Sequence, residues 1–178
     1  MSTIQDNISL LKYNTFQCEA IAKHFCVVHD EKELVKAITW TKQNNCPYLI
    51  LGGGSNILFT KDFNGLVIKM EIKGIQKLTD QDQTITLRVG AGENWHLFVQ
   101  YAIEKGWSGI ENLSLIPGTV GACPIQNIGA YGVEVKDVIQ SVEVLDIQDN
   151  TIKTLQNKDC QFGYRDSIFK QNKHKYII

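Results

Sequence analysis

The sequence predicts a protein of mixed helices and strands, of the α+β class, folded as two lobes. A strand, helix, strand pattern occupies residues 24–51, and a further strand follows at 66–70. From Glu71 onward the pattern changes to short paired strands around one helix. A chain of 178 residues can form one domain or two small lobes with a substantial core. We therefore predict a first lobe over residues 1–70 and a second over residues 71–178.

The composition is that of an ordinary soluble globular protein, with 43% hydrophobic and 21% charged residues. Eighteen basic and nineteen acidic residues give a net charge of -1, which offers no field to attract nucleic acid or an anionic membrane. The expected partner is a small molecule.

The chain contains no apolar run as long as a membrane span, and its N-terminus lacks the pattern of an export signal. We expect a cytoplasmic protein. The five cysteines are an odd number without a C-x-x-C pair, which indicates reduced thiols in the core or near a site. Only His24 and Cys26 come close to a ligand pair, so we expect no metal.

The first lobe begins with a lead-in, residues 7–23, whose function the pattern does not reveal. Residues 24–29 are typical of a short strand. Asp30 followed by Glu33 matches a capping box, and apolar residues then recur at helical spacing to about Asn45. The wholly apolar run 48–51 predicts a strand covered on both faces.

A glycine-rich loop, GGGSN at Gly52 to Asn56, follows that strand directly. Glycines at the end of a strand allow the backbone N–H groups to turn toward one point, which suits a pyrophosphate. The loop is neither a dinucleotide fingerprint nor a P-loop, because it lacks G-x-G-x-x-G before a helix and a following Lys-Ser or Lys-Thr. A flexible turn is the alternative.

The remaining strands are predicted from turn residues and alternation. Asn64-Gly65 favours a hairpin-type turn before a strand at 66–70. Residues 75–78 and 84–89 then predict a β-hairpin around a polar turn. Later runs at 138–147 and 151–155 predict a second strand pair around Gln148 to Asn150, and residues 176–178 read as the start of another strand.

One helix is predicted in the second lobe, where GAGENW at Gly90 to Trp95 leads into it and Gly106 ends it. Trp95 and Trp107 are expected in the core or between lobes. The predicted buried side of this helix consists of Leu97, Phe98, Tyr101, Ala102 and Ile103. Farther along, Asn157 is expected to cap a short turn over residues 158–162.

The stretch Leu115 to Glu134, LIPGTVGACPIQNIGAYGVE, carries only one charged residue, at its end. Small residues let a backbone approach a ligand closely, and an uncharged surface suits a flat, partly apolar one. The apolar members that favour such a ligand are Ile116, Ile125, Ile128 and Tyr131. The stretch predicts a cofactor cradle, with a tight irregular turn through the core as the alternative.

Arg165 stands among aromatic and apolar neighbours in FGYRDSIFK. A guanidinium held in this way can bind a carboxylate through two parallel hydrogen bonds. A local ion pair with Asp166, or a bond to a loop carbonyl, is the alternative. Tyr164 and Ser167 carry the same ambiguity.

Three separated segments carry a family resemblance: LILGGGSNILF, the long run from GAGENW to GAYGVEV, and CQFGYRDSIFK. Together they resemble the UDP-N-acetylenolpyruvoylglucosamine reductase (MurB) family, flavoenzymes of bacterial peptidoglycan precursor synthesis. The similarity runs from about Asn14 to the last residue. The chain also resembles the wider group of vanillyl-alcohol-oxidase (PCMH-type) flavoproteins, whose FAD lies between two α+β lobes.

The resemblance implies FAD and NADPH as cofactors. The FAD pyrophosphate would be held by Gly53, Gly54, Ser55 and Asn56, and the isoalloxazine would lie between the lobes against residues 116–132. The cofactor-binding residues implied there are Ile116, Pro117, Gly118, Thr119, Gly121, Ala122, Cys123, Ile125, Gln126, Asn127, Gly129, Ala130, Tyr131 and Gly132.

The implied reaction reduces UDP-N-acetylglucosamine enolpyruvate to UDP-N-acetylmuramate. NADPH would reduce the flavin and leave, and the substrate would then take a hydride at its vinyl CH2 carbon and a proton at the neighbouring carbon. Arg165 matches the catalytic arginine of the family and would bind the substrate carboxylate. Tyr131 and Tyr164 would bind substrate beside it.

Two departures from the family pattern limit the resemblance. The serine that supplies the proton and an assisting glutamate belong to a C-terminal substrate domain that has no counterpart here. We therefore expect the N-terminal FAD-binding part of a reductase, with self-association possible through surface which that domain would cover. Ala122 and Cys123 replace serines of some relatives. An FAD-binding module without turnover, or another flavin-dependent oxidase of this fold, is the alternative.

Overall fold

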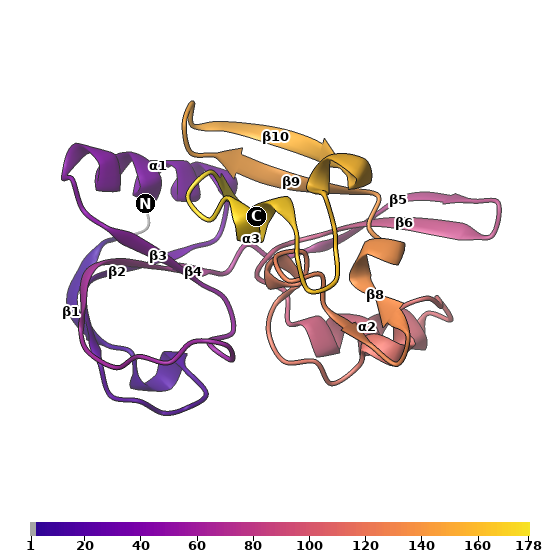
Figure 1. The fold of residues 1–178 in the computed structure, drawn as a ribbon, viewed down its shortest axis with the longest axis horizontal. Coiled ribbons are helices and arrows are strands. Elements are labelled where there is room, and N and C mark those ends of the chain that lie inside the picture. Colours follow the sequence, from indigo (N-terminus) through magenta and orange to yellow (C-terminus); the bar gives the residue numbers. More distant parts are fainter. Residues whose placement is uncertain (1–2) are drawn as a thin grey trace. The chain divides into compact units, whose positions relative to one another are not determined.

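The structure, a computed structural model, describes residues 3–178, and the chain divides into two compact units, Met1–Ile72 and Lys73–Ile178. The division falls two residues after the predicted boundary. Each unit has its own hydrophobic core. Figure 1 shows the order of the elements along the chain, with α1 and the strands β1 to β4 in the first unit.

Unit 1 is built on a four-stranded sheet in the order β1-β2-β4-β3. β1 is antiparallel to β2, whereas β4 runs parallel to both of its neighbours. The helix α1 lies along one face of this sheet (Figure 1). The elements are β1 (Gln5–Ser9), the 3-10 turn η1 (Leu11–Tyr13), β2 (Ile21–Val28), α1 (Glu31–Gln43), β3 (Tyr48–Leu51) and β4 (Phe63–Met70).

The predicted helix and its N-terminal cap are confirmed in α1. The Asp30 carboxylate accepts a hydrogen bond from the Glu33 N–H at 2.7 Å, as an N-cap residue does. The Glu33 carboxylate in turn accepts from the His29 N–H at 3.0 Å. The start of the helix is therefore held from both directions by its own sequence.

The predicted turn at Asn64-Gly65 is wrong, because β4 runs straight through both residues. The Leu66 N–H donates to the carbonyl of Pro47 at 2.9 Å, which places this segment in the sheet. A Cβ on Gly65 would lie 2.3 Å from that same carbonyl oxygen. Gly65 is present because another backbone passes close to it, and the local turn signal is overridden.

The strand at 48–51 was predicted to be buried on both faces, but the strand that is buried in this way is β4. In β3 only Leu51 is buried, whereas four consecutive residues of β4, Gly65 to Ile68, are buried. β3 is an edge strand of the sheet and β4 is an inner one, so only β4 is covered in this way.

Unit 2 contains a hairpin, a helix, a short ribbon and a three-stranded sheet in the order β10-β9-β11. The predicted strand pairs and the final strand are confirmed, with the first strand of the hairpin longer than expected. Its elements are β5 (Ile75–Gln81), β6 (Thr84–Val89), α2 (Trp95–Glu104), η2 (Glu111–Leu113), η3 (Val120–Ala122), β7 (Gly129–Ala130), β8 (Val133–Glu134), η4 (Val135–Asp137), β9 (Ser141–Asp146), β10 (Thr151–Gln156), η5 (Asn157–Cys160), α3 (Ile168–Gln171) and β11 (Tyr176–Ile177).

The helix α2 begins and ends where predicted, but its buried face is rotated. Leu97 and Ile103, expected inside, are 61% and 48% exposed, whereas Trp95, Val99 and Ala102 are buried. The Trp95 indole N–H donates to the carbonyl of Leu113 at 2.7 Å. This bond and the surrounding core fix the rotation of the helix and turn Leu97 outward.

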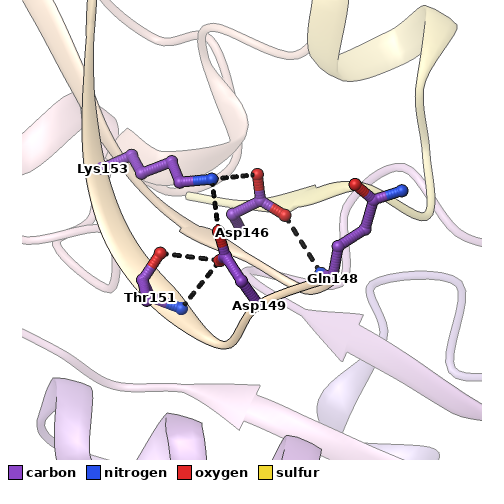
Figure 2. A network of polar contacts seen from close by, with 5 residues as sticks. All are labelled: Asp146, Gln148, Asp149, Thr151 and Lys153. Carbon is purple, nitrogen blue, oxygen red and sulfur yellow. Dashed lines mark hydrogen bonds and ion pairs between the residues drawn. The ribbon is translucent and has the colours of Figure 1, made fainter.

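The turn between β9 and β10 is held by a network of charges (Figure 2). The Lys153 ammonium contacts the carboxylates of Asp146 at 2.8 Å and Asp149 at 2.7 Å. Asp149 also accepts from the Thr151 hydroxyl, and Asp146 accepts from the Gln148 N–H. The bond to Lys153 lowers the pKa of Asp149 to about 2 and lowers the pKa of Asp146.

The predicted capping role of Asn157 is wrong. Gln156 is the N-cap of η5, and it shares a capping box with Asp159. The Asn157 side chain instead donates to the backbone carbonyls of Lys136 and Ile139, both at 2.8 Å. Asn157 therefore joins two segments that are far apart in the sequence, which local pattern does not reveal.

Across residues 3–178, no helix combines the length and the apolar character needed to cross a membrane. The same residues contain no group of three or more His, Cys, Asp or Glu side chains that could hold a metal ion. All five cysteines are free thiols, and Cys26, Cys123 and Cys160 are buried. Burial raises the pKa of the Cys26 and Cys160 thiols to about 11, so both stay protonated and unreactive.

Candidate functional site

The glycine-rich loop of unit 1 presents a run of backbone donors. It follows β3 and runs from Gly52 to Asn56. Within residues 3–178, no group accepts a hydrogen bond from the N–H of Gly53, Gly54, Ser55 or Asn56. Consecutive N–H groups without an acceptor in the protein are available to bind an anion.

The lead-in that the sequence left unexplained supports this loop. The Thr15 N–H donates to the Gly54 carbonyl at 3.1 Å. Gly54 has a φ of +69°, and a Cβ there would lie 2.0 Å from the carbonyl oxygen of Tyr13. On the other side of the loop, the Lys69 ammonium donates to the Gly52 carbonyl at 3.0 Å. The loop is therefore anchored through its carbonyls while its N–H groups stay available.

Unit 2 contains a groove of about 540 Å³. One wall is the antiparallel ribbon of β7 and β8, and the other is the turn that carries Tyr164 and Arg165. A volume of this size is within the range of small-molecule sites. The complete lining consists of Gly129, Ala130, Tyr131, Gly132, Val133, Glu134, Tyr164 and Arg165.

Arg165 lies at the tip of a tight turn. Gly163 and Asp166 exchange two backbone hydrogen bonds, at 3.0 and 3.2 Å, and leave Tyr164 and Arg165 between them. The Asp166 carboxylate accepts from the Gln171 side chain at 2.8 Å, and among residues 3–178 it forms no ion pair with Arg165, which was the alternative considered for this arginine. Within the described part of the chain no residue binds the Arg165 guanidinium. It remains available for an acidic ligand.

Three non-glycine residues around the groove hold left-handed backbone: Asn127, Tyr131 and Arg165, with φ of 43°, 51° and 54°. This conformation is uncommon for large side chains and costs about 1–3 kcal/mol for each residue. Strain of this kind persists where the surrounding structure requires it. Tyr131 and Tyr164 are also 88% and 89% exposed, so two aromatic rings flank the groove.

Sequence reasoning missed Val133 and Glu134 in the lining of the groove. Glu134 is the single charged residue of the stretch that was predicted to be a cradle, which was the available signal. Its carboxylate pairs with the Lys136 ammonium, and this bond raises the pKa of Lys136. The groove therefore presents Arg165, which has no ionic partner in the described part of the chain, beside a carboxylate that is paired with Lys136.

The earlier part of the predicted cradle, residues 116–127, is not in this lining. It forms a loop around η3 that pairs with the segment before α2: the Gly121 N–H donates to Ala91 at 2.9 Å and the Val120 N–H donates to Glu93 at 2.9 Å. A Cβ on Gly121 would lie 2.6 Å from the Ala91 side chain. Close packing of two backbone segments explains this glycine without a ligand.

The side chains of this loop divide by exposure. Thr119, Cys123 and Asn127 are buried, so only their backbone atoms could reach a ligand. Burial raises the pKa of the Cys123 thiol, which contacts the Thr119 carbonyl at 3.3 Å. The more accessible members are Pro117, Ala122 and Ile125, with Ile116, Gly118 and Gln126 half-buried.

Ser167, whose role the sequence left open, is fully buried. Its hydroxyl donates to the carbonyl of Ile125 at 2.7 Å and also caps α3. It therefore has a structural function and does not face a ligand directly.

The four donors of the glycine loop fit the anionic part of a dinucleotide cofactor, and the groove fits a flat ring or an acidic ligand.

Comparison with known proteins agrees with these features. Residues 22–156 match the family described as the FAD binding domain. Over 176 residues the chain is 53% identical to a UDP-N-acetylenolpyruvoylglucosamine reductase of Amoebophilus asiaticus, with 98% of this chain and 52% of that protein covered. The chain spans about half the length of the curated relatives it matches.

Solved structures give the same result. The crystal structure of UDP-N-acetylenolpyruvylglucosamine reductase from Thermus caldophilus has a TM-score of 0.72 and 28% identity, covering 94% of this chain and 57% of that one. A VAO-type flavoprotein from Myceliophthora thermophila has a TM-score of 0.59 at 16% identity, covering 75% of this chain and 26% of that one, and so shows the fold alone. The α+β fold is of the vanillyl-alcohol-oxidase type, and the chain belongs to the FAD binding domain family.

Proposed function

We propose that this chain is the FAD-binding part of a flavin-dependent oxidoreductase that reduces UDP-N-acetylglucosamine enolpyruvate to UDP-N-acetylmuramate. The observation that carries the proposal is the position of Arg165, whose guanidinium has no ionic partner among residues 3–178 and lines a groove with the ribbon 129–134. The names of the curated relatives support the substrate, and the matched family supports FAD.

The glycine loop is proposed to hold the FAD pyrophosphate. The N–H groups of Gly53 to Asn56 provide donors without a charged side chain, and Ser55 and Asn56 add side-chain donors. Backbone donors of an anchored loop lose little entropy when an anion binds.

Arg165 is proposed to bind the substrate carboxylate through two parallel hydrogen bonds. As the vinyl group is reduced, negative charge builds on the carbon beside that carboxylate, and a guanidinium already in place stabilises this charge without rearrangement. When bound, FAD supplies the hydride, with NADPH proposed as the source of reducing equivalents. Tyr131 and Tyr164 flank the site and are proposed to contact the substrate.

The unbridged cysteines support a reducing compartment, and we propose the cytoplasm.

A second candidate function is an FAD-binding module that does not turn over by itself. The extent of the matched relatives favours it, because the chain spans about half of their length. In that case the residue that donates the proton would come from outside these 178 residues.

Both candidates are tested in one preparation. The purified protein is examined for flavin absorbance, and NADPH consumption is then followed with and without the enolpyruvyl nucleotide. Consumption that depends on the nucleotide supports the reductase, and bound flavin without such consumption supports the module. A preparation that binds no FAD when the cofactor is supplied would contradict both.

A further inference from the structure

The buried side chain of Asn127 connects the two walls of the groove. Its amide NH2 donates to the Gly163 carbonyl at 2.8 Å, at the base of the turn that carries Arg165. Its amide oxygen accepts from the Lys136 N–H at 3.1 Å, two residues beyond the ribbon strand β8. Asn127 itself is fully buried, and both of its hydrogen bonds are partly buried.

Each wall is also held from its other side. The Lys136 carbonyl accepts from the Asn157 side chain at 2.8 Å. The turn is tied a second time by Ser167, whose hydroxyl donates to the carbonyl of Ile125, two residues before Asn127. The Arg165 carbonyl accepts from the Lys170 ammonium at 2.8 Å. The arginine turn therefore cannot move relative to the segment 125–127 without breaking bonds that are buried or partly buried.

We propose that Asn127 is a positioning residue which sets the distance between Arg165 and the ribbon, and thereby the selectivity of the groove for a ligand with a carboxylate. The inference rests on the proposed function for the identity of that ligand. Asparagine suits this position because it combines a donor and an acceptor on one planar group and tolerates its left-handed φ of 43°.

The substitution Asn127→Asp separates this role from general stability. The carboxyl group introduced has nearly the same shape and can still accept from the Lys136 N–H. When ionised it has no proton for the Gly163 carbonyl, whereas when protonated it can donate there again. Burial, together with this bond to the neutral form, raises its pKa above the ordinary value of about 3.9.

Two charged groups on the contacting segments keep their charge over the pH range of the test, because the pKa of Lys136 is raised and the pKa of Asp166 is lowered. Lys136 is paired with Glu134, and Asp166 is bonded to Gln171. In the variant, the hydrogen bond to the Gly163 carbonyl should therefore be absent at a pH above the raised pKa of the introduced carboxyl group. It should form again as the pH falls below that pKa.

The first measurement is amide hydrogen exchange of the peptide that spans residues 162–168. In the Asn127→Asp variant at pH 8 we expect the protection factors there to fall by about tenfold or more, and to recover toward wild type at pH 5. The matched control is Asn157→Asp, which removes bonds to the Lys136 and Ile139 carbonyls but none to the arginine turn. It should leave this peptide protected.

The second measurement compares the affinities of the FAD-loaded protein for the enolpyruvyl nucleotide and for UDP-N-acetylglucosamine, which lacks the carboxylate. At pH 8 the ratio of these two affinities should be about tenfold smaller in the Asn127→Asp variant than in wild type. At pH 5 the ratio should return to the wild-type value. Full protection and full preference in this variant at pH 8 would overturn the proposal. So would a loss of protection of the peptide 162–168 in the Asn157→Asp control.

If Asn127→Asp does not fold, Ser167→Ala removes the second tie and should lower protection and preference at both pH values. Unchanged behaviour of Ser167→Ala would then contradict the proposed positioning network. If wild type itself shows no preference between the two nucleotides, the proposed function fails, and hydrogen exchange alone decides whether Asn127 holds the turn.

Discussion

At the scale of single residues, the site depends on side chains that are either fully satisfied or left without a partner. Asn127 and Ser167 are buried, and their side chains form hydrogen bonds to the backbone. Arg165 is exposed and lacks an ionic partner among residues 3–178. The neighbours of Arg165 left its role open, and the family resemblance implied that it is a site residue. The sequence could not show that the Asn127 side chain has a structural role different from that of the other predicted cradle residues. The hydrogen-bond partners of Asn127 lie 9 and 36 residues away in the chain.

Replacing Arg165 with lysine tests the role of the guanidinium. We expect Arg165→Lys to lower turnover in the active holoenzyme by about a hundredfold, because one ammonium cannot form two parallel bonds to a carboxylate. The flavin absorbance should stay the same, since the proposed FAD contacts lie elsewhere. Steady-state kinetics measure the first quantity and spectroscopy the second. Unchanged turnover would refute the assignment.

Gly54 is a residue at which the structure demands glycine. We expect Gly54→Ala to lower the free energy of unfolding by more than about 3 kcal/mol, because a Cβ would meet the Tyr13 carbonyl and the backbone is left-handed. Gly106→Ala is the matched control. Gly106 has a similar φ of +73° with no atom near its Cβ position, so only strain of about 1–2 kcal/mol is expected. Equal losses in urea denaturation would contradict the clash.

At the scale of elements, local signals predicted α1, β3 and the strand pair β9 and β10 because their patterns are self-contained. The polar, exposed β1 gave no signal, since its place in the sheet comes from pairing with β2. The ribbon of β7 and β8 was likewise missed, because two residues in each strand are too few for a periodic pattern. Sequence reasoning named candidate site residues, but it could not give the geometry of the groove walls.

The turn between β9 and β10 makes a specific contribution to acid stability. The carboxyl of Asp149 has its pKa lowered from 3.8 to about 2 by Lys153, so its contribution is complete above pH 4 and is lost as the pH falls toward 2. The Lys153→Met variant should show a smaller fall in the free energy of unfolding across that range, together with lower stability at neutral pH. An identical pH profile in chemical denaturation of the two proteins would exclude this role.

At the scale of the whole molecule, each unit has its own core and its own candidate binding feature. The glycine loop belongs to unit 1 and the groove with Arg165 to unit 2. The lobe boundary near Glu71 was predicted because the pattern of elements changes there. Membership of the FAD binding domain family was predictable from three separated motifs. One of them lies in the first unit and two lie in the second.

Binding of FAD should stabilise the chain. At a free concentration one hundred times its Kd, a ligand that binds only the folded state adds about 2.7 kcal/mol, so thermal unfolding should shift upward. Riboflavin is the control, because it has the ring but lacks the pyrophosphate that the N–H groups of Gly53 to Asn56 are proposed to hold. Equal stabilisation by riboflavin and FAD at equal concentration would contradict the function of the loop.

The central claim is that the groove beside Arg165 recognises the carboxylate of a substrate next to a flavin. The most direct measurement is titration of the FAD-loaded protein with the enolpyruvyl nucleotide and with UDP-N-acetylglucosamine, followed by the change in flavin absorbance. We predict that the enolpyruvyl nucleotide perturbs the flavin spectrum at concentrations at least about tenfold lower, and that Arg165→Lys removes this advantage. Equal responses to both nucleotides, or an advantage that survives in Arg165→Lys, would contradict the account.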